Sequence, residues 1–174
     1  MIVVLMGVSG SGKTTIGTRL ARQLGVVFAD ADDYHPEANK EKMKAGHALT
    51  DEDREPWLEA LNRVMRGWLG ASKGGVMACS ALKESYRQTL AAGMPEGTVR
   101  YVLLDGSKEL IAARLQARHH EFMNPQLLES QESTLERPGG NSVEVVNDRA
   151  PEVVVVEILA RVGQPAGMEL RSPG

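Results

Sequence analysis

The sequence predicts an α/β fold of three layers, in which helices cover both faces of a central parallel sheet of about five strands. Short apolar runs of strand length alternate along the chain with longer segments whose apolar residues recur every three or four positions. The first run, residues 2–6, leads directly into a glycine-rich loop and then a helical segment. Because parallel neighbours must be joined by a crossover, usually a helix, this alternation favours a parallel sheet.

Composition and charge limit the classes of protein to be considered. The 174 residues are 42% hydrophobic and carry a net charge of −3, which fits one globular domain without a basic surface for nucleic acid. The single cysteine, Cys79, excludes an internal disulfide and favours a reducing compartment. No apolar run approaches the roughly 20 residues of a membrane span. The sequence therefore predicts a cytoplasmic protein that has neither nucleic acid nor a membrane as a partner.

Five segments have the apolar composition of buried strands. The second of them closes in the acidic residues of "VVFADAD", and the fourth closes in Asp105, which we interpret as a turn residue. Strands are predicted at residues 2–6, 26–32, 74–80, 99–106 and 143–147.

Helices are predicted between these strands from the spacing of apolar residues and from residues that begin or end a helix. Apolar residues four apart line one face of the first helix, which Gly25 ends. Thr50 or Asp51 can cap the long third helix, and Ser80 can cap the fourth. The expected helices are residues 13–24, 36–45, 51–69, 81–92, 107–118 and 151–162.

The alternation of strands and helices shows no linker to a second domain, so residues 1–162 are expected to form one domain. Residues 119–141 are rich in polar side chains and interrupt the alternation. An insertion at the carboxyl edge of a sheet is where lids are found, so this segment is predicted to be a small lid. Residues 163–174 contain turn-forming residues without periodicity and are predicted to be a loose tail.

The loop between the first strand and the first helix fits G-x-x-x-x-G-K-[ST] at every fixed position. Its backbone N–H groups and the amino end of the next helix form an anion site, which predicts a P-loop NTPase fold. Lys13 would reach the β- and γ-phosphates of ATP, and the Thr14 hydroxyl would bind Mg²⁺. No Asn-Lys-x-Asp signature for guanine is present, which argues against a GTPase. The residues assigned to ATP in this loop are Gly7, Val8, Ser9, Gly10, Ser11, Gly12, Lys13, Thr14 and Thr15.

Two carboxylates, Asp30 and Asp32, lie two residues apart at the end of the second predicted strand. If the strand continues through both, their side chains point to the same side. Asp30 is then placed to hold a water molecule bound to Mg²⁺. Asp32 is placed to accept a proton from an attacking hydroxyl during in-line phosphoryl transfer. A solvated acidic turn is the alternative.

Two long segments carry a more specific signal than the P-loop. "DADDYHPEANKEKMKAGHALTDEDREPWLEAL" (residues 30–61) and "CSALKESYRQTL" (residues 79–90) resemble the motifs of the gluconate kinases (gluconokinases), small P-loop sugar-acid kinases related to shikimate kinase. The resemblance covers about residues 3 to 160. It implies ATP-dependent phosphorylation of D-gluconate to 6-phospho-D-gluconate, and commonly a homodimer.

A sugar acid needs cations for its carboxylate and hydrogen-bonding groups for its hydroxyls. Arg54, Lys83 and Arg87 each lie within or beside a motif of the resembled family and are the predicted substrate-binding cations, with surface ion pairs as the alternative. Lys83 and Arg87 are expected one turn apart on helix 81–92, whose amino terminus near Ser80 can itself attract an anion. His35 either binds substrate hydroxyls or braces its loop.

Two arginines border the apolar stripe of the predicted helix 107–118. Arg114 lies between two apolar positions on the helical wheel, and Arg118 lies near one of them. This placement suits arginines that face the nucleotide, so Arg114 is assigned to ATP binding and Arg118 to the transferring phosphoryl group. The arginine spacing in the resembled family supports this assignment, and a structural ion pair is the alternative.

The chain departs from the resembled family at a few positions. Ala31 replaces a glycine, and the lid reads His120-Glu121-Phe122 and Ser130-Gln131-Glu132 where relatives commonly have G-H-F and S-Q-F. Because a carboxylate inside a closed site would repel the γ-phosphate, Glu121 is expected to face solvent or to pair with Arg118. Two other functions remain open: a kinase for shikimate or another sugar acid, and a nucleotide-binding protein with degenerate catalysis.

Overall fold

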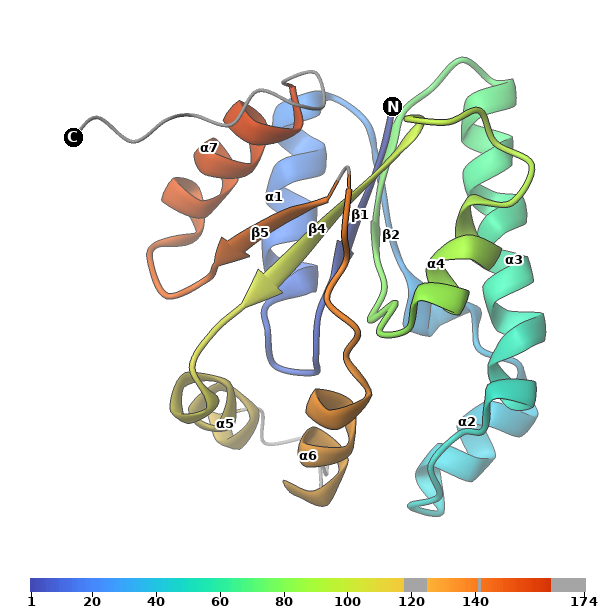
Figure 1. Ribbon diagram of the computed structural model, residues 1–174, viewed down its shortest axis with the longest axis vertical. Coiled ribbons are helices and arrows are strands. Elements are labelled where there is room, and N and C mark those ends of the chain that lie inside the picture. Colours follow the sequence, from blue (N-terminus) through green and yellow to red (C-terminus); the bar gives the residue numbers. More distant parts are fainter. Residues whose placement is uncertain (118–124, 141, 164–174) are drawn as a thin grey trace.

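The computed structural model describes residues 1–117, 125–140 and 142–163, and these form one all-parallel sheet flanked by helices (Figure 1). The five strands lie in the order β2-β3-β1-β4-β5. Every residue of the central strand β1 is buried, as expected for a strand with helices over both faces. The predicted fold class is therefore confirmed. The strands are β1 (Ile2–Met6), β2 (Val27–Asp30), β3 (Gly75–Ala78), β4 (Val99–Asp105) and β5 (Val143–Val146).

The helices of the described residues cover the sheet in two groups. Alternate residues of β1 enter different cores: Val3 and Leu5 pack with α1 and α7, whereas Val4 and Met6 pack with α3 and α4. Figure 1 shows these two pairs of helices on opposite sides of the sheet. The helices are α1 (Lys13–Leu24), α2 (Glu37–Lys44), α3 (Asp51–Gly70), α4 (Glu84–Ala91), α5 (Lys108–Ala117), α6 (Pro125–Thr134) and α7 (Pro151–Val162).

The second strand ends earlier than predicted. β2 stops at Asp30, and residues 31–34 form a short 3₁₀ helix, η1 (Ala31–Tyr34). The carboxylate of Asp30 accepts a hydrogen bond from the backbone N–H of Asp32, 3.2 Å away, and so caps this turn. The expectation that the strand places Asp30 and Asp32 on one side is therefore wrong, because the chain turns between them.

The fourth helix begins later than predicted. Ala81 has a positive φ of 44°, and Lys83 is extended at φ −96° and ψ 151°, so α4 starts at Glu84. Residues 80–83 form a loop after β3 instead of the first turn of a helix. Ser80 consequently does not cap the helix, and Lys83 and Arg87 do not lie on one helix as expected.

Other sequence expectations fare differently. Thr50 caps α3 in a reciprocal arrangement with Asp53, as one of the two predicted caps. The predicted lid, residues 119–141, contains α6, although residues 118–124 and 141 lie outside the described part of the chain. Of the predicted tail, only residue 163 is described. Among the described helices, none has the length and apolarity needed to cross a membrane.

Candidate active site

The loop between β1 and α1 leaves no room for a side chain at two of its glycines. Gly12 has a φ of +93°, and a Cβ on it would lie 2.4 Å from Nδ2 of Asn147. A Cβ on Gly7 would lie 2.7 Å from the carbonyl oxygen of Leu104. Helix α1 begins at Lys13, so the positive end of its dipole lies beside the same loop. This tight backbone at a helix amino terminus fits the phosphates of a nucleotide.

Two polar side chains are held within this loop. Nζ of Lys13 donates hydrogen bonds to the carbonyl oxygens of Gly7 at 2.9 Å and Val8 at 3.0 Å, which keeps the ammonium over the loop. The hydroxyl of Ser11 is buried and has no hydrogen-bond partner among the described residues. Because buried polar atoms are normally paired, a polar ligand in the loop would supply the partner that Ser11 lacks.

The two predicted Mg²⁺ residues meet at the end of the loop. The hydroxyl of Thr14, in the first turn of α1, donates to Oδ2 of Asp30 at 2.7 Å. No cluster of three or more His, Cys, Asp or Glu side chains suited to a metal occurs within the described ranges. Oxygen ligands from one hydroxyl and one carboxylate, completed by water and phosphate oxygens, are what Mg²⁺ requires in nucleotide sites.

The predicted general base lies one turn beyond this pair. Asp32 is part of η1, and its side chain is 87% exposed. Its carboxylate oxygen Oδ1 lies 3.8 Å from Nε2 of His35. The chain thus places one carboxylate, Asp30, against the P-loop helix and the next, Asp32, toward solvent, where an acceptor molecule can reach it.

His35 braces the loop and also keeps one nitrogen available. Its ring stacks on Trp57 with 4.3 Å between ring centroids, and Nε1 of Trp57 donates to the carbonyl oxygen of Ala31 at 2.7 Å. Burial, together with the charges of Arg54 and Lys40, lowers the pKa of His35 to about 4, so the imidazole is neutral at pH 7. Nδ1 is buried without a hydrogen-bond partner in the part of the chain that the structure describes. These contacts support the bracing role.

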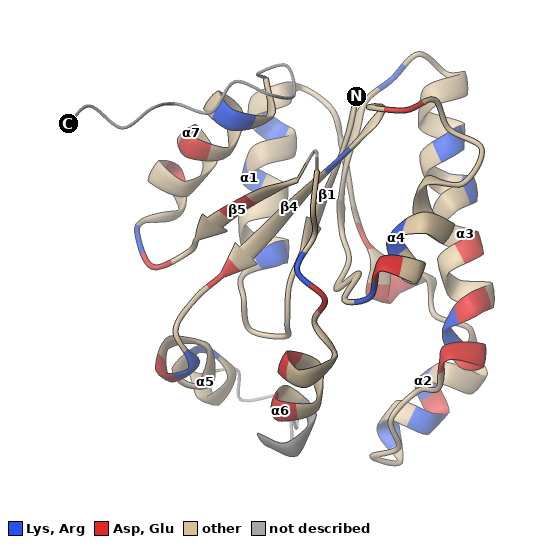
Figure 2. Cartoon of the chain, viewed as in Figure 1, with Lys and Arg blue, Asp and Glu red and all other residues tan. Residues whose placement is uncertain are grey.

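Two of the predicted acid-binding cations converge on one carboxylate where α3 begins. Oδ2 of Asp51 lies 2.7 Å from Nζ of Lys83, and Oδ1 accepts a hydrogen bond from the hydroxyl of Tyr86 and lies 3.8 Å from Arg54. Both cations also lie over the Tyr86 ring, Arg54 at 5.7 Å and Lys83 at 5.5 Å from its centroid. Hydrogen bonds from Lys83 and Tyr86 lower the pKa of Asp51, and the bond to Asp51 raises that of Lys83. The cluster therefore already holds a carboxylate between two cations. Basic and acidic residues are mixed along the neighbouring helices α2 and α3 (Figure 2).

The third predicted cation has a structural environment. Arg87 is only 3% exposed, and its guanidinium donates to the carbonyl oxygens of Ala81 at 2.9 Å and Leu82 at 3.2 Å and to the carboxylate of Glu84. These contacts favour a role in holding the loop before α4 over direct contact with substrate. The amino terminus of α4, where a substrate anion was expected, binds the carboxylate of Glu136 through the N–H of Glu84, at 2.6 Å.

The predicted nucleotide arginine lies against the P-loop. Nη2 of Arg114 donates to the carbonyl oxygen of Asn147 at 2.7 Å, whereas its Nη1 is buried and without a hydrogen-bond partner among the described residues. A Cβ on Gly12 would lie 3.8 Å from that nitrogen. Arg114 therefore presents an unsatisfied donor beside the phosphate loop. Arg118 and Glu121, for which roles were also predicted, lie outside the described residues.

Several residues with clear contacts at the site were not singled out from the sequence. Asn147 is buried, and its Nδ2 donates to the carbonyl oxygen of Ser11 at 2.7 Å, which braces the P-loop from the end of β5. The polar residue directly after the apolar run "VEVV" was the available signal. Asp51 and Tyr86 were visible only as members of the motifs, and Gln131 only as part of the lid.

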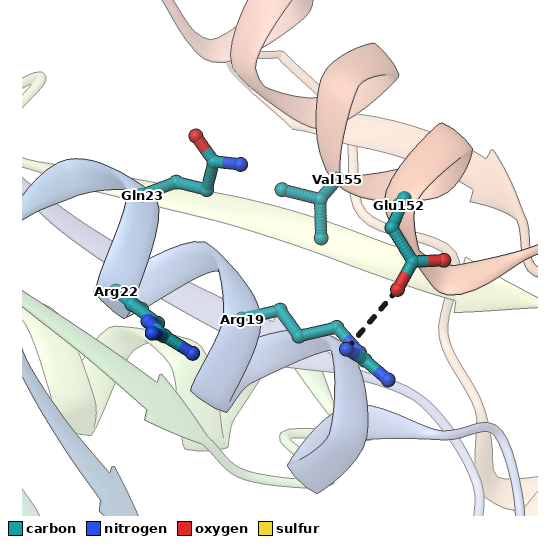
Figure 3. Close-up of a pocket in the computed structure, with 5 residues that line it drawn as sticks. All are labelled: Arg19, Arg22, Gln23, Glu152 and Val155. Carbon is teal, nitrogen blue, oxygen red and sulfur yellow. Dashed lines mark ion pairs between the residues drawn. The ribbon is translucent and has the colours of Figure 1, made fainter.

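A separate hollow lies between α1 and α7, on the face of the sheet away from α3 and α4 (Figure 3). It has a volume of about 430 Å³, and within it Arg19 pairs with Glu152 at 3.1 Å. It contains none of the predicted site residues and is therefore separate from the candidate active site. Most of the predicted site residues lie in the loops at the carboxyl ends of β1, β2 and β3. The hollow is lined by Arg19, Arg22, Gln23, Glu152 and Val155.

The chain is similar to known proteins over most of its length. Residues 2–138 match the AAA domain family. A probable gluconokinase of Dictyostelium discoideum is 49% identical over 142 residues, which cover 79% of this chain and 71% of the relative. The chain belongs to the gluconokinase family. A thermosensitive gluconokinase of Escherichia coli K12 is 46% identical, over 82% of this chain and 75% of the relative.

Solved structures support the same family and the wider fold. The crystal structure of a gluconokinase from Sinorhizobium meliloti is 40% identical, covers 92% of this chain and 90% of its own, and superposes with a TM-score of 0.82. A shikimate kinase from Aquifex aeolicus superposes with a TM-score of 0.58 at 20% identity, over 94% of this chain and 96% of its own. The second likeness shows a shared fold alone. Gluconokinase-family membership thus extends over most of the chain.

Proposed function

We propose that the chain is a gluconokinase, which transfers the γ-phosphoryl group of ATP to D-gluconate and releases 6-phospho-D-gluconate and ADP. The observation that carries the proposal is the meeting of three groups at one edge of the sheet: a complete P-loop, the Thr14–Asp30 pair and the exposed carboxylate of Asp32. The relatives at 40–49% identity support gluconate as the acceptor.

The nucleotide half of the site is built from the P-loop and α5. Backbone N–H groups of residues 7–15 would hold the phosphates of ATP, with Lys13 beside the β- and γ-phosphates. Thr14 and Asp30 would hold Mg²⁺, and the metal supplies positive charge where negative charge develops on the transferring group. The buried, unpartnered Nη1 of Arg114 would donate to the nucleotide.

The acceptor half of the site divides between η1 and the start of α3. Asp32 would accept the proton of the attacking gluconate hydroxyl, and the neutral His35 beside it would bind a neighbouring hydroxyl through Nδ1. Lys83 and Arg54 would bind the carboxylate of the acid, in the place where they now contact Asp51. Substrate binding thus requires these cations to share or exchange their internal carboxylate.

The direct test is phosphorylation by the purified chain. We expect ADP release with Mg-ATP and D-gluconate, measured by a coupled assay, and much slower release with shikimate, glucose or nucleoside monophosphates. ADP release with another acid but not with gluconate would change the substrate. ATP binding without ADP release on any acid would favour a protein with degenerate catalysis. The expected homodimer stays a prediction, and light scattering of the purified chain measures it.

Lys83→Ala should raise KM for gluconate chiefly and leave kcat closer to the parental value. A carboxylate contact is made in both the ground state and the transition state, so its loss weakens binding of both. Lys73→Ala, which removes an exposed lysine beyond the other end of β3, is the control and should keep parental kinetics. A parental KM in Lys83→Ala would remove this lysine from the acid site.

A further inference from the structure

Helix α6 and the two residues after it lie between the nucleotide half and the acceptor half of the site (Figure 1). Within it, residues 128–136 contact the P-loop at one end and the loop 80–83 at the other. Neither set of contacts has a role in the proposed chemistry so far.

The contacts with the P-loop are both polar and apolar. The side-chain oxygen Oε1 of Gln131 accepts a hydrogen bond from the backbone N–H of Ser9 at 2.7 Å. Leu128 and Leu135 pack against a buried cluster that includes Val8 of the P-loop and Leu82 of the loop 80–83. A phosphate oxygen bound at the Ser9 N–H would displace Gln131, so a nucleotide at this position would alter the contact between α6 and the P-loop.

The hydrogen bonds to the loop 80–83 and to the start of α4 are made by Glu136. Its backbone N–H donates to the carbonyl oxygen of Leu82 at 2.9 Å, and its carboxylate oxygen Oε2 accepts from the N–H of Glu84 at 2.6 Å. Lys83 is the N-cap residue of α4, and its side chain makes no capping hydrogen bond. Glu136 therefore supplies, from a distant part of the chain, the capping group that α4 lacks.

The loop before α4 needs such support. Ala81 has a positive φ of 44°, a conformation that a non-glycine residue adopts only when its surroundings hold it there. Arg87 holds the carbonyl oxygens of Ala81 and Leu82 from below, and Glu136 holds Leu82 and Glu84 from the side of α6. Lys83 lies between these two points of attachment, so its position depends on both.

We propose that Glu136 is a positioning residue for Lys83, and that Gln131 links this positioning to the P-loop. Nucleotide at the P-loop then changes how firmly Lys83 is held for the acid. The proposal rests on the proposed function in two respects, nucleotide binding at the P-loop and the assignment of Lys83 to the substrate carboxylate. The mechanical link itself depends only on contacts within the chain.

Hydrogen exchange of backbone amides tests this link without turnover and without gluconate. Glu136→Ala should speed exchange at the amides of Glu84 and Ser85 about fivefold, as expected for a lost helix cap. Saturating Mg-ADP should change exchange at these amides by about threefold or more in the parent and leave them unchanged in Glu136→Ala. Glu136→Gln keeps an acceptor oxygen and should restore most of the protection. Glu129→Ala, at an exposed carboxylate of the same helix, is the control and should behave as the parent.

Equal exchange in the parent and Glu136→Ala would overturn the proposal, and so would a parent that binds Mg-ADP without a change in exchange at these amides. Kinetics then separate this failure from failure of the proposed function. In an active parent, Glu136→Ala should raise KM for gluconate about fivefold or more while KM for ATP stays within about twofold. A parental KM for gluconate contradicts the positioning role with the function intact. A parent inactive on every acid contradicts the function, and the exchange result still decides the link.

Discussion

At the scale of single residues, two neighbouring carboxylates are distinguished by what they contact. Asp30 accepts from the Thr14 hydroxyl and from the N–H of Asp32, so its position is fixed against α1. Asp32 lies in the turn that follows, with a side chain 87% exposed. One carboxylate is therefore suited to a metal site, and the other to a proton transfer with a molecule that arrives from solvent.

Asp32→Asn should lower kcat by about 100-fold or more, because the amide cannot accept the proton of the attacking hydroxyl. Affinity for ATP should change little, since the phosphates are bound by the P-loop. Steady-state kinetics with gluconate, together with calorimetric titration of an ATP analogue, measure the two effects. Asp33→Asn, at the exposed next residue, is the control. A kcat near the parental value would make Asp32 a solvated turn residue.

His35 makes stability depend on pH in a predictable direction. Its pKa is lowered to about 4 in the folded protein, mainly by burial, against an ordinary value of 6.5. The unfolded chain therefore binds the proton more readily, and the contribution of neutral His35 to stability is lost as pH falls from about 6.5 toward 4. Urea unfolding at pH 7 and pH 5 should show a smaller loss of stability in His35→Gln than in the parent. His47→Gln, at an exposed histidine, should lose as much as the parent.

At the scale of elements, the connections between strands and helices form the site. The β1–α1 loop carries the candidate phosphate site, η1 carries Asp32 and is followed by His35, and the β3–α4 loop carries Lys83. Each follows the carboxyl end of a parallel strand, so the three loops meet at one edge of the sheet. The helices and strands therefore act as a rigid support for loops that carry the chemistry.

Gly12→Ala should weaken nucleotide binding by about tenfold or more, because a Cβ 2.4 Å from Nδ2 of Asn147 forces the P-loop to shift. Gly25→Ala is a matched control. Gly25 also has a positive φ, +65°, but a Cβ there meets no atom within 4 Å. Backbone strain is then common to both variants, and only Gly12→Ala should lose affinity in a titration with an ATP analogue. Equal affinities would show that the loop adapts to the methyl group.

At the scale of the whole molecule, the P-loop joins β1, which contributes residues to the cores on both faces of the sheet, to α1, which packs in one of them. Residues of β1 enter both cores, and Ile16 and Leu20 of α1 are buried with α7. A ligand that holds the P-loop in its folded form consequently favours the folded state of the entire domain.

An ATP analogue with Mg²⁺ at 100 times its Kd should stabilise the folded chain by about 2.7 kcal/mol. For a chain of this size, that corresponds to a rise in Tm of roughly 5 to 10 °C. Thermal unfolding followed by circular dichroism measures the shift. At the same ligand concentration, a tenfold loss of affinity in Gly12→Ala should reduce this rise to about half. An unchanged Tm in the parent would contradict nucleotide binding by the folded chain.

The sequence by itself determined the fold class, the phosphate loop and the family. These depend on local signals: apolar periodicity, glycines at fixed spacing and uninterrupted motifs. Thr14 and Asp30 are each assigned to Mg²⁺ from the sequence, Thr14 by the P-loop motif and Asp30 by its place at the end of the second strand, and the structure brings the two side chains to 2.7 Å.

Only the tertiary structure decided which charged side chains stay accessible to solvent and which hold the framework. Lys83 and Arg87 have the same sequence signal, yet the positive φ of Ala81 delays α4, so Lys83 stays in the loop and Arg87 is buried beneath it. The partners Asp51 and Glu136 lie 32 and 52 positions away from Lys83 and Glu84, respectively. Hydrogen bonds at such separations depend on how the elements pack together. Residue type and local spacing along the chain therefore do not predict them.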